Sequence, residues 1–378
     1  MQVLLITQEF PPNILGGVGY HAYQLASSLV EQGHEVHVLT GESDTHVRDE
    51  STTPLPAVEV SMISYRRSVA PRVWFARKAA QWLQSFDGLD EFDFIHAHEY
   101  IDFDAIPFDG PTLQKLHFNL SEKPVYLSQP AVPRPLDDLA FTVADATIWR
   151  AERRLERRAI RSADIVVANS ELTKGLALER HDLETVHMSV IYNGVDVERF
   201  TPNEDEATTE LLFVGGDQQR KGIDELIEAV RVLAPSTDVH VTVAGTAKAL
   251  DTEELEANLP INFVGRVDHD ELVTLYRRAG GLVHPALYEP FGNVILEALS
   301  CATPVVTSDP SRCGAAELLD EQVGVMVDPS DPIALAEAMH AVVEKPGCFD
   351  AARCRAIAEQ YTWHRVAGET IDLVRSTT

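Results

Sequence analysis

The segment from residue 281 to residue 308 constrains the fold of this chain most, because it reads as strand, helix and strand in close succession. Short apolar runs at 281–284 and 304–307 predict two strands, and apolar residues with helical spacing over 294–299 predict a helix between them. A helix that connects two strands in this way is typical of a βαβ unit in a parallel sheet. The segment therefore indicates an α/β protein that binds its ligand at the carboxyl ends of strands.

Two carboxylates flank the start of this predicted helix. Glu289 precedes it, and Glu297, eight residues later, projects from its first turns, so both side chains can face one ligand. The N–H groups of Gly292, Asn293 and Val294 have no partner inside the helix and, with the helix dipole, they suit a phosphate. Acids on either side of a phosphate fit a nucleotide sugar. The alternative is an exposed loop acid followed by an ordinary amphipathic helix.

The run HPALYEPFGNVILEALSCATPVVTS resembles the signature of the retaining glycosyltransferases of family four, the group 1 glycosyl transferases. Its paired acids, Phe-Gly turn and Pro-Val-Val carry the resemblance, although Ala302 stands where that family usually has Gly. The resemblance implies the GT-B fold, in which two Rossmann-like domains face each other across a cleft. It also implies that Glu289 holds the donor sugar hydroxyls and Glu297 the ribose. The other donor-binding residues it implies here are Phe291, Gly292, Asn293 and Val294.

A cationic turn, Arg220 and Lys221, lies between a strand candidate and a helix candidate in the second half of the chain. Such a pair can neutralise a leaving diphosphate, and a solvated turn is the alternative. By resemblance, Lys221 matches the family's Lys, whereas Gly216 occupies the family's Arg position, and whether Arg220 replaces that Arg stays open. The backbone that the resemblance assigns to the nucleotide base belongs to Gly265, Arg266 and Val267.

The first half opens with a strand, a glycine-rich loop, a helix over about 20–32 and a second strand, which is a βαβ opening. Glycines let the loop backbone approach a ligand closely, but the full G-x-G-x-x-G dinucleotide fingerprint is missing. The resembled family has a glycine-rich loop at this place. It implies that Gly17 lies against the donor diphosphate and Gly16 on the acceptor side.

Histidines end the next two strand candidates of the first half. His96 and His98 close one apolar run and His117 closes the next, so all lie where loops gather at the carboxyl edge of a parallel sheet. A structural role is the usual one for a strand histidine. By resemblance, however, His98 lines the acceptor side of the cleft and His117 lies near the donor sugar as part of the catalytic set.

Length and composition favour two domains. A chain of 378 residues with 45% apolar residues can form two cores. The expected division is residues 1–190 plus 362–378 for the acceptor-side domain and residues 191–361 for the nucleotide-sugar domain. No apolar run is long enough to span a membrane and the start of the chain has no signal-peptide pattern, so a cytoplasmic protein is expected. Four cysteines without C-x-x-C spacing argue against a disulfide framework and a zinc site.

The chain is strongly acidic, with a formal net charge of −28 and only seven Lys among 31 basic residues. This surface composition is associated with proteins that work in high salt. Residues 65–84 reverse the sign, with five basic residues and no acid. The part after Pro71 predicts a helix with Trp74, Phe75 and Trp82 among cations, which fits an anionic membrane surface. An amphipathic helix that covers the sheet is the alternative. A second basic run, 149–161, predicts a solvated helix with i,i+4 ion pairs.

These features predict a retaining glycosyltransferase that moves a sugar from a nucleoside-diphosphate sugar to an acceptor hydroxyl. The acceptor expected is a lipid-linked or cell-surface glycan precursor, met at the inner face of the cell membrane. Beyond the nucleotide-sugar co-substrate no cofactor is expected, and no metal is implied because no Asp-x-Asp stands at a strand end. No nucleic-acid partner is expected. The alternatives are a nucleotide-sugar epimerase of similar fold and a non-catalytic partner subunit, which the Gly216 position would favour.

Overall fold

The computed structural model divides the chain into two compact units, residues 1–192 with 363–378 and residues 193–362. We call them the first and the second unit. The structure describes residues 1–13, 16–42, 55–65, 70–117, 138–181, 183, 186–202, 208–215, 219–235, 237–248, 250–344 and 348–377. Among the helices in these ranges, none is long and apolar enough to cross a membrane.

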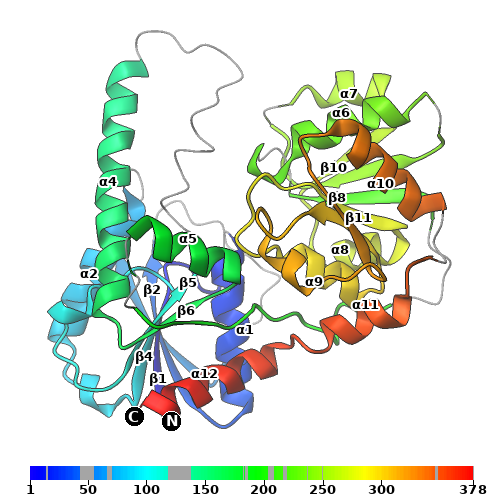
Figure 1. Cartoon of the computed structure of the whole chain (residues 1–378). Helices are drawn as coiled ribbons and strands as arrows, with labels where there is room; N and C mark the ends of the chain where they lie inside the picture. Colours follow the sequence, from blue (N-terminus) through cyan, green and yellow to red (C-terminus); the bar gives the residue numbers. More distant parts are fainter. Residues whose placement is uncertain are drawn as a thin grey trace. The chain divides into compact units, whose positions relative to one another are not determined.

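Seven parallel strands form the sheet of the first unit, in the order β3-β2-β1-β4-β5-β6-β7 (Figure 1). β1 shows why the apolar runs become strands: its residues from Val3 to Ile6 are fully buried, as expected for a strand covered on both faces. The bounds are β1 (Gln2–Ile6), β2 (Glu35–Glu42), β3 (Val58–Ser64), β4 (Phe94–Ala97), β5 (Thr112–Leu116), β6 (Ile165–Ala168) and β7 (Met188–Val190).

Helices cover both faces of this sheet (Figure 1). Alternate residues of β1 enter different cores: Leu5 packs with residues of α1 and α12, whereas Leu4 packs with residues of α2. The helices are α1 (Gly17–Glu31), α2 (Pro71–Ser85), α4 (Asp138–Ser162), α5 (Glu171–His181) and α12 (Trp363–Thr377), with short 3-10 turns η1 (Leu89–Glu91) and η2 (Phe103–Ala105).

Helix α2 forms at the predicted place, but its aromatic residues do not all face solvent. Phe75 is fully buried in the core beneath the helix, and Trp82 packs against the same core. Arg72 lies 3.8 Å from the buried carboxylate of Glu99. The expectation that Phe75 enters a lipid surface is therefore wrong, and of the three aromatic residues Trp74 is the most exposed, at 38%. Two of the predicted cations, Arg66 and Arg67, lie outside the described residues.

Helix α4 also differs from its prediction. Glu156, expected to pair with arginines along the helix, is fully buried and instead binds groups from other segments. Its Oε1 accepts a hydrogen bond from the Tyr100 hydroxyl at 2.7 Å, and its Oε2 lies 2.7 Å from His181 Nε2. The two acids of this run, Glu152 and Glu156, thus face the core. The arginines of α4 are consequently left as a largely basic outer face.

The second unit has six parallel strands in the order β10-β9-β8-β11-β12-β13. The strands are β8 (Glu210–Val214), β9 (His240–Ala244), β10 (Ile261–Gly265), β11 (Gly281–His284), β12 (Val305–Ser308) and β13 (Gly324–Val327). The helices are α6 (Ile223–Leu233), α7 (Thr252–Asn258), α8 (His269–Arg278), α9 (Asn293–Ser300), α10 (Pro332–Glu344) and α11 (Ala351–Ala358), with turns η4 (Gln219–Lys221) and η5 (Gly314–Leu318).

In each parallel sheet the order of the strands reverses at one point. In the first unit the strand order runs outward from β1 on one side and from β4 on the other, and in the second unit the same happens between β8 and β11. Chain segments that leave the carboxyl ends of two such strands turn to opposite faces of the sheet, which opens a crevice for ligands. Most of the predicted site residues lie at these two switch points, whereas His117 follows the neighbouring strand β5 and Gly265 ends β10.

Candidate active site

The segments that follow β8 and β11 meet at the switch point of the second unit. Arg220, in η4 after β8, places Nη1 2.9 Å from Oε2 of Glu289, which follows β11. The carbonyl oxygen of Arg220 accepts hydrogen bonds from the N–H groups of Leu287 and Tyr288, at 2.9 and 3.1 Å. The structure therefore brings together two predicted site residues, 69 positions apart in the chain, through both side chain and backbone.

Gly222 allows this close approach. Its φ of +80° is in the left-handed region, and a Cβ there would lie 1.9 Å from the carbonyl oxygen of Pro285 in the segment after β11. Lys221, just before it, lays its side chain over Gly215, where a Cβ would lie 2.5 Å from Lys221 Cδ. The missing side chains of Gly215 and Gly222 thus leave room for the cationic turn at the switch point. Gly216, the family's Arg position, lies outside the described residues.

The charges around Glu289 keep it ionised. Burial alone would raise the pKa of this carboxyl, but the charges of Arg220 and Lys221 and the nearby His284 more than compensate and lower its pKa. The side chain of Glu289 is 12% exposed, so one part of it remains accessible to a ligand. Nε2 of His284 lies 3.7 Å from Oε2 of Glu289. Burial lowers the pKa of His284 to about 4, which leaves its imidazole neutral.

Glu297 is in a different environment. It projects from the first turns of α9, as predicted, and its Oε2 accepts a hydrogen bond from the Tyr276 hydroxyl of α8 at 2.8 Å. Burial raises the pKa of Glu297, against the opposing effects of that hydrogen bond and of the Lys221 charge. The Lys221 charge acts on both Glu289 and Glu297, which links the two acids electrostatically although their pKa values shift in opposite directions.

The start of α9 is built to present its backbone. Gly292 caps the helix with a φ of +99°, and a Cβ there would lie 3.3 Å from Glu289 Cγ. Asn293, the first helical residue, accepts a hydrogen bond at its Oδ1 from Asn193 Nδ2 at 2.9 Å. The carbonyl oxygen of Phe291 accepts from the N–H of Ala315 at 2.7 Å. With Val294 in the first turn, this leaves helix N–H groups directed outward, the arrangement that suits an anion.

The residues predicted to meet the base lie at the same edge of the sheet. Gly265 ends β10, two strands from β8, and has a φ of +73°; its carbonyl oxygen accepts from Gly245 at 2.7 Å. Arg266 is exposed and Val267 is half-buried just before α8. These residues therefore share an edge with Glu289 and Lys221, and within the described part of the chain no hydrogen bond or ion pair joins the two sets.

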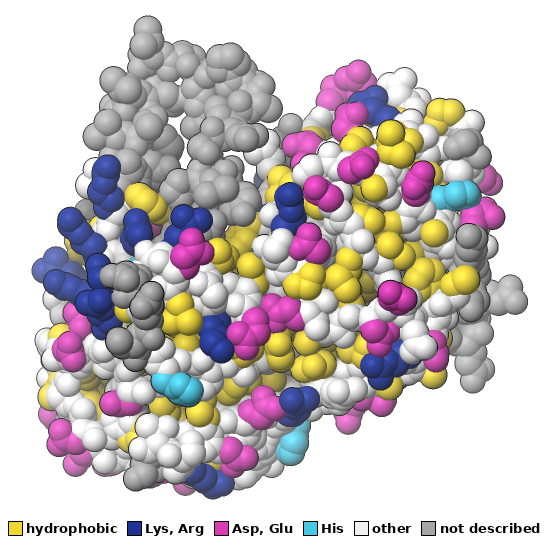
Figure 2. Space-filling view, viewed as in Figure 1, with side chains coloured by type: hydrophobic (Ala, Val, Ile, Leu, Met, Phe, Trp, Pro, Cys, Tyr) yellow, Lys and Arg dark blue, Asp and Glu magenta, His cyan; other side chains and the backbone are white. Residues whose placement is uncertain are grey.

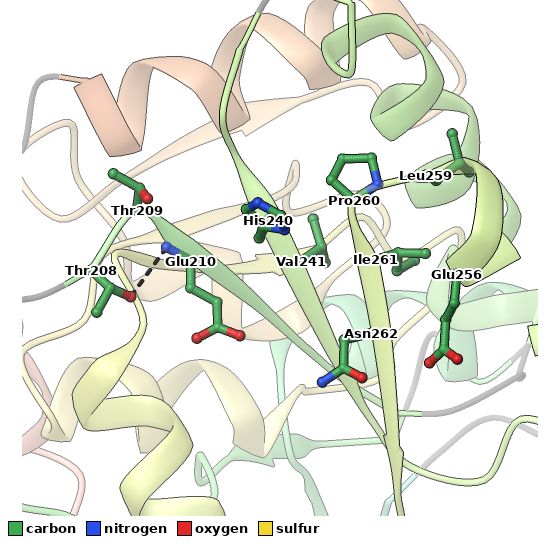
Figure 3. Close-up of a pocket in the computed structure, with 10 residues that line it drawn as sticks. All are labelled: Thr208, Thr209, Glu210, His240, Val241, Glu256, Leu259, Pro260, Ile261 and Asn262. Atoms are coloured by element: carbon green, nitrogen blue, oxygen red, sulfur yellow. Dashed lines mark hydrogen bonds between the residues drawn. The ribbon is translucent and has the colours of Figure 1, made fainter.

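A cavity of about 460 Å³ opens at the opposite edge of this sheet (Figure 3). Its lining includes the first residues of three neighbouring strands, Glu210, His240 and Ile261. Ligands of parallel α/β sheets bind at the carboxyl ends of strands, whereas this cavity lies at their amino ends. It is therefore separate from the predicted donor site.

In the first unit, the structure brings the predicted histidines together. His98 follows β4 and His117 follows β5, and their Nδ1 and Nε2 atoms lie 2.8 Å apart. α1 begins at Gly17, with Gly16 as its cap, three residues before the predicted start. The N–H of Gly16 donates to Glu9 Oε2 at 3.0 Å, so the glycine-rich loop is held by an acid that follows β1.

Two family models of glycosyltransferases match this chain, and together they cover most of both units. The model of the family Glycosyl transferases group 1 matches residues 195–361, and that of Glycosyltransferase Family 4 matches residues 15–199. The chain belongs to the group 1 glycosyltransferases. An uncharacterized glycosyltransferase of Methanocaldococcus jannaschii is 27% identical over 99% of this chain and 98% of its own length.

Solved structures show that this glycosyltransferase has the GT-B fold. Sucrose-phosphate synthase of Thermosynechococcus elongatus aligns with a TM-score of 0.79 at 21% identity, covering 99% of this chain and 98% of the other. HepE of Anabaena, solved in complex with UDP and glucose, aligns with a TM-score of 0.69 at 20% identity, covering 100% and 99%. At these identities the likeness concerns the fold alone.

Three residues of the candidate site were not predicted from the sequence. Tyr276 binds Glu297, Asn193 binds Asn293, and His284 lies against Glu289. Asn193 belongs to the run SVIYNGVDVERF, where the chain passes from the first unit to the second, so that run was the available signal for it. Tyr276 carried no signal, because its partner is set by the packing of α8 on α9.

The one departure within the signature run has a structural cost. Ala302 follows the end of α9 with a φ of +63°, in the left-handed region that favours glycine. The N–H groups of Ala302 and Thr303 donate to the carbonyls of Leu299 and Ala298, both at 2.9 Å, which is the Schellman pattern of a helix end.

We therefore expect Ala302→Gly to stabilise the second unit. The left-handed conformation costs an L residue about 1 kcal/mol, so the substitution should raise the free energy of unfolding by about that amount, less the entropy that glycine adds to the unfolded chain. Urea unfolding followed by far-UV circular dichroism measures the change. Ala334→Gly, inside α10, is the matched control and should destabilise instead. An equal loss of stability in both variants would contradict the assignment of strain at Ala302.

Proposed function

We propose that this glycosyltransferase transfers a sugar from a nucleoside-diphosphate sugar to an acceptor hydroxyl with retention of the anomeric configuration. The observation that carries the proposal is the convergence of Glu289, Arg220 and Lys221 beside the α9 N-terminus, at the switch point of the second unit. A carboxylate, two cations and free helix N–H groups match a sugar linked to a diphosphate.

The donor is proposed to lie with its diphosphate at the N–H groups of Gly292, Asn293 and Val294. Lys221 and Arg220 supply the positive charge that the leaving diphosphate needs. Glu289 holds the sugar hydroxyls and Glu297 the ribose, with Gly265, Arg266 and Val267 at the base. The solved HepE structure, in complex with UDP and glucose, supports a nucleotide-sugar donor for a chain of this fold.

In the proposed reaction the acceptor hydroxyl attacks the anomeric carbon from the face on which the diphosphate leaves. The new C–O bond forms as the bond to the leaving phosphate oxygen breaks, and that oxygen takes the proton of the hydroxyl. No protein base is required, so the protein contributes position and charge stabilisation. His117 is proposed beside the donor sugar, Gly17 against the diphosphate, and His98 and Gly16 on the acceptor side, all by resemblance to the family.

The acceptor is proposed to be lipid-linked or a glycan precursor at an anionic membrane surface. Figure 2 shows Lys and Arg side chains gathered over α2 and α4, which pack against each other. We call this the α2/α4 basic surface. It consists of the exposed cations of the two helices: Arg77, Lys78, Arg150, Arg154, Arg157, Arg158 and Arg161. In a chain of net charge −28, such a surface supplies local attraction to anionic lipid.

A panel of nucleotide sugars tests the proposed function, with and without a lipid extract as the source of acceptors. We expect one donor to release its nucleoside diphosphate only when an acceptor is present, and the product to keep the donor's anomeric configuration by NMR. Conversion of the donor to a second nucleotide sugar without acceptor would establish the epimerase alternative. Inverted product would overturn retention, and binding of donors without any turnover would favour the non-catalytic partner subunit.

We expect the protein to co-sediment with anionic vesicles through the α2/α4 basic surface. Replacing Arg77, Lys78 and Arg154 by Gln should weaken binding by roughly 10²-fold at moderate salt, since each cation near the surface contributes about 1 kcal/mol. Arg231, Lys248 and Arg353, replaced by Gln in the second unit, give a control of equal charge change. If both triple variants pellet as well as the parent, or the parent stays in the supernatant, a soluble acceptor becomes the better proposal.

A further inference from the structure

Three histidines from separate elements of the first unit converge in its interior. His21 belongs to α1, His98 follows β4 and His117 follows β5, and their exposed fractions are 1%, 4% and 8%. One ligand atom from each lies within 4.8 Å of the other two. Among the described residues, this is the single group of three or more His, Cys, Asp or Glu side chains that meets this distance. We call it the histidine cluster.

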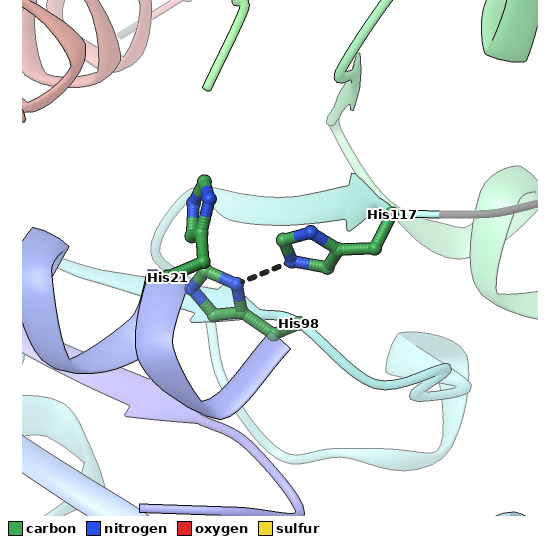
Figure 4. Close-up of side chains that lie close together, drawn as sticks. All are labelled: His21, His98 and His117. Atoms are coloured by element: carbon green, nitrogen blue, oxygen red, sulfur yellow. Dashed lines mark hydrogen bonds between the residues drawn. The ribbon is translucent and has the colours of Figure 1, made fainter. Parts of the chain in front are cut away.

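The His98 and His117 rings are stacked, and the His21 ring is edge-on to both. The ring centroid of His21 lies 5.1 Å from that of His98 and 4.6 Å from that of His117, and both pairs are edge-on. Figure 4 shows His98 and His117 joined by their 2.8 Å hydrogen bond, with the His21 ring beside them. His98 Nε2 is buried and has no hydrogen-bond partner among the described residues. This nitrogen can carry the ring proton when Nδ1 binds another group.

The cluster is in the chemical form that binds metals. Burial lowers the pKa of both His98 and His117 well below the usual value for histidine, and neighbouring cationic and imidazole groups, with Lys115 common to both, lower it further. Neutral imidazole is a preferred ligand of Zn²⁺, Cu²⁺, Ni²⁺ and Fe²⁺, and each of the three rings offers one nitrogen to a shared ion.

We propose that His21, His98 and His117 bind one divalent transition-metal ion, of which Zn²⁺ is the best fit. Three imidazole ligands complete three corners of a tetrahedron and leave the fourth for water or an anion. The ion would tie the first turns of α1 to the carboxyl ends of β4 and β5, at the switch point of the first unit. His98 and His117 are also the side chains proposed for the acceptor side and the donor sugar, so the metal-binding experiments below are designed to need no transfer activity.

The geometry needs only a small adjustment to hold the ion. Tetrahedral Zn²⁺ with Zn–N bonds of about 2.0–2.1 Å sets its ligand nitrogens about 3.3 Å apart. The His98–His117 pair, at 2.8 Å, must therefore open slightly as the ion replaces the hydrogen bond. One ring shifts its proton to its other nitrogen, so two neutral imidazoles remain and no net proton is released.

The test is direct metal binding to the metal-free full-length protein, made in a Cys348→Ser background because Cys348 is an exposed thiol. Competition with a chromophoric chelator should show one Zn²⁺ per chain, and Co²⁺ should give the visible absorption bands of tetrahedral coordination. His21→Gln, His98→Gln and His117→Gln, made separately, should each weaken Zn²⁺ binding by at least about 100-fold, because even an outer-shell partner of a ligand contributes about 10- to 100-fold. His240→Gln is the control, since His240 is an exposed histidine of the second unit.

The fluorescence of Trp363 can be measured in the parent protein, so this readout does not depend on the folding of the glutamine variants. The ring centroid of Trp363 lies 4.9 Å from that of His21, so a paramagnetic ion such as Cu²⁺ bound in the cluster should quench its fluorescence. Trp363→Phe should remove most of that quenching and leave Zn²⁺ stoichiometry unchanged. The proposal is overturned if the parent binds no ion in the micromolar range. It is equally overturned if all three glutamine variants, folded by circular dichroism, bind Zn²⁺ as tightly as the His240→Gln control.

Discussion

Glu289→Ala is expected to lower kcat for sugar transfer by ~10²-fold or more, while the nucleoside diphosphate binds nearly as tightly as to the parent. The reason is that Glu289 is proposed to hold hydroxyls of the transferred sugar, and the free diphosphate lacks that sugar. Its lowered pKa keeps the carboxylate ionised at neutral pH, so the lost interaction is charge-assisted. Turnover with the identified donor and calorimetric titration with the diphosphate measure the two quantities.

The ion pair with Arg220 complicates this experiment, because removing Glu289 also frees the guanidinium 2.9 Å away. Arg220→Gln and the double variant complete a double-mutant cycle that separates the two effects. Glu321→Ala, an exposed glutamate of the same unit, is the matched control and should keep full activity. Loss of diphosphate binding as large as the loss of kcat would show that Glu289 belongs to the phosphate site and not to the sugar site.

Lys221→Met is expected to weaken both diphosphate binding and turnover, by ~2 to 4 kcal/mol in transition-state stabilisation, or roughly 30- to 1,000-fold in kcat/KM. Methionine keeps an apolar chain over Gly215, where the Lys221 side chain packs, and removes only the charge. The charge matters in both states because the diphosphate is anionic when bound and gains charge as it leaves.

Lys248→Met, at an exposed position of the same unit, controls for the general loss of one positive charge. Thermal unfolding of both variants shows whether the substitution perturbs the fold. A Lys221→Met enzyme as active as the parent would refute the proposed leaving-group role. Activity that falls without any change in diphosphate affinity would restrict that role to the transition state.

Local patterns explain which parts of the fold could be predicted. β11 has the predicted bounds and α9 begins directly after Gly292, because a short apolar run, a glycine and a helical apolar pattern are all encoded within a few residues. The start of α1 was placed too late, since glycines disfavour helix in isolation. In the fold, Gly19 lies inside α1, and Glu9 packs so close that a Cβ there would lie 2.9 Å from Glu9 Cβ, which explains why a glycine occupies this helical position.

Contacts between distant segments explain what the sequence could not show. The predicted acids were correct as positions on and before a helix, but their partners, Arg220 and Tyr276, come from other elements and follow from packing alone. The same holds for Phe75, whose place among cations suited both a lipid surface and a protein core. His21 gave no signal, because it lies on α1 and meets His98 and His117 only once the sheet forms.

The two ends of the second unit lie side by side, and this has a consequence for how the enzyme can diversify. The N–H of Val195 donates to the carbonyl of Tyr361 at 2.8 Å, and Val195 forms a parallel bridge with Thr362. The whole unit therefore enters and leaves the first unit's chain through neighbouring points, as inserted domains do. Recombination at these two points would exchange the unit as a cassette, and chimaeras joined there offer a direct way to move the proposed donor-side groups between chains without redesigning the first unit.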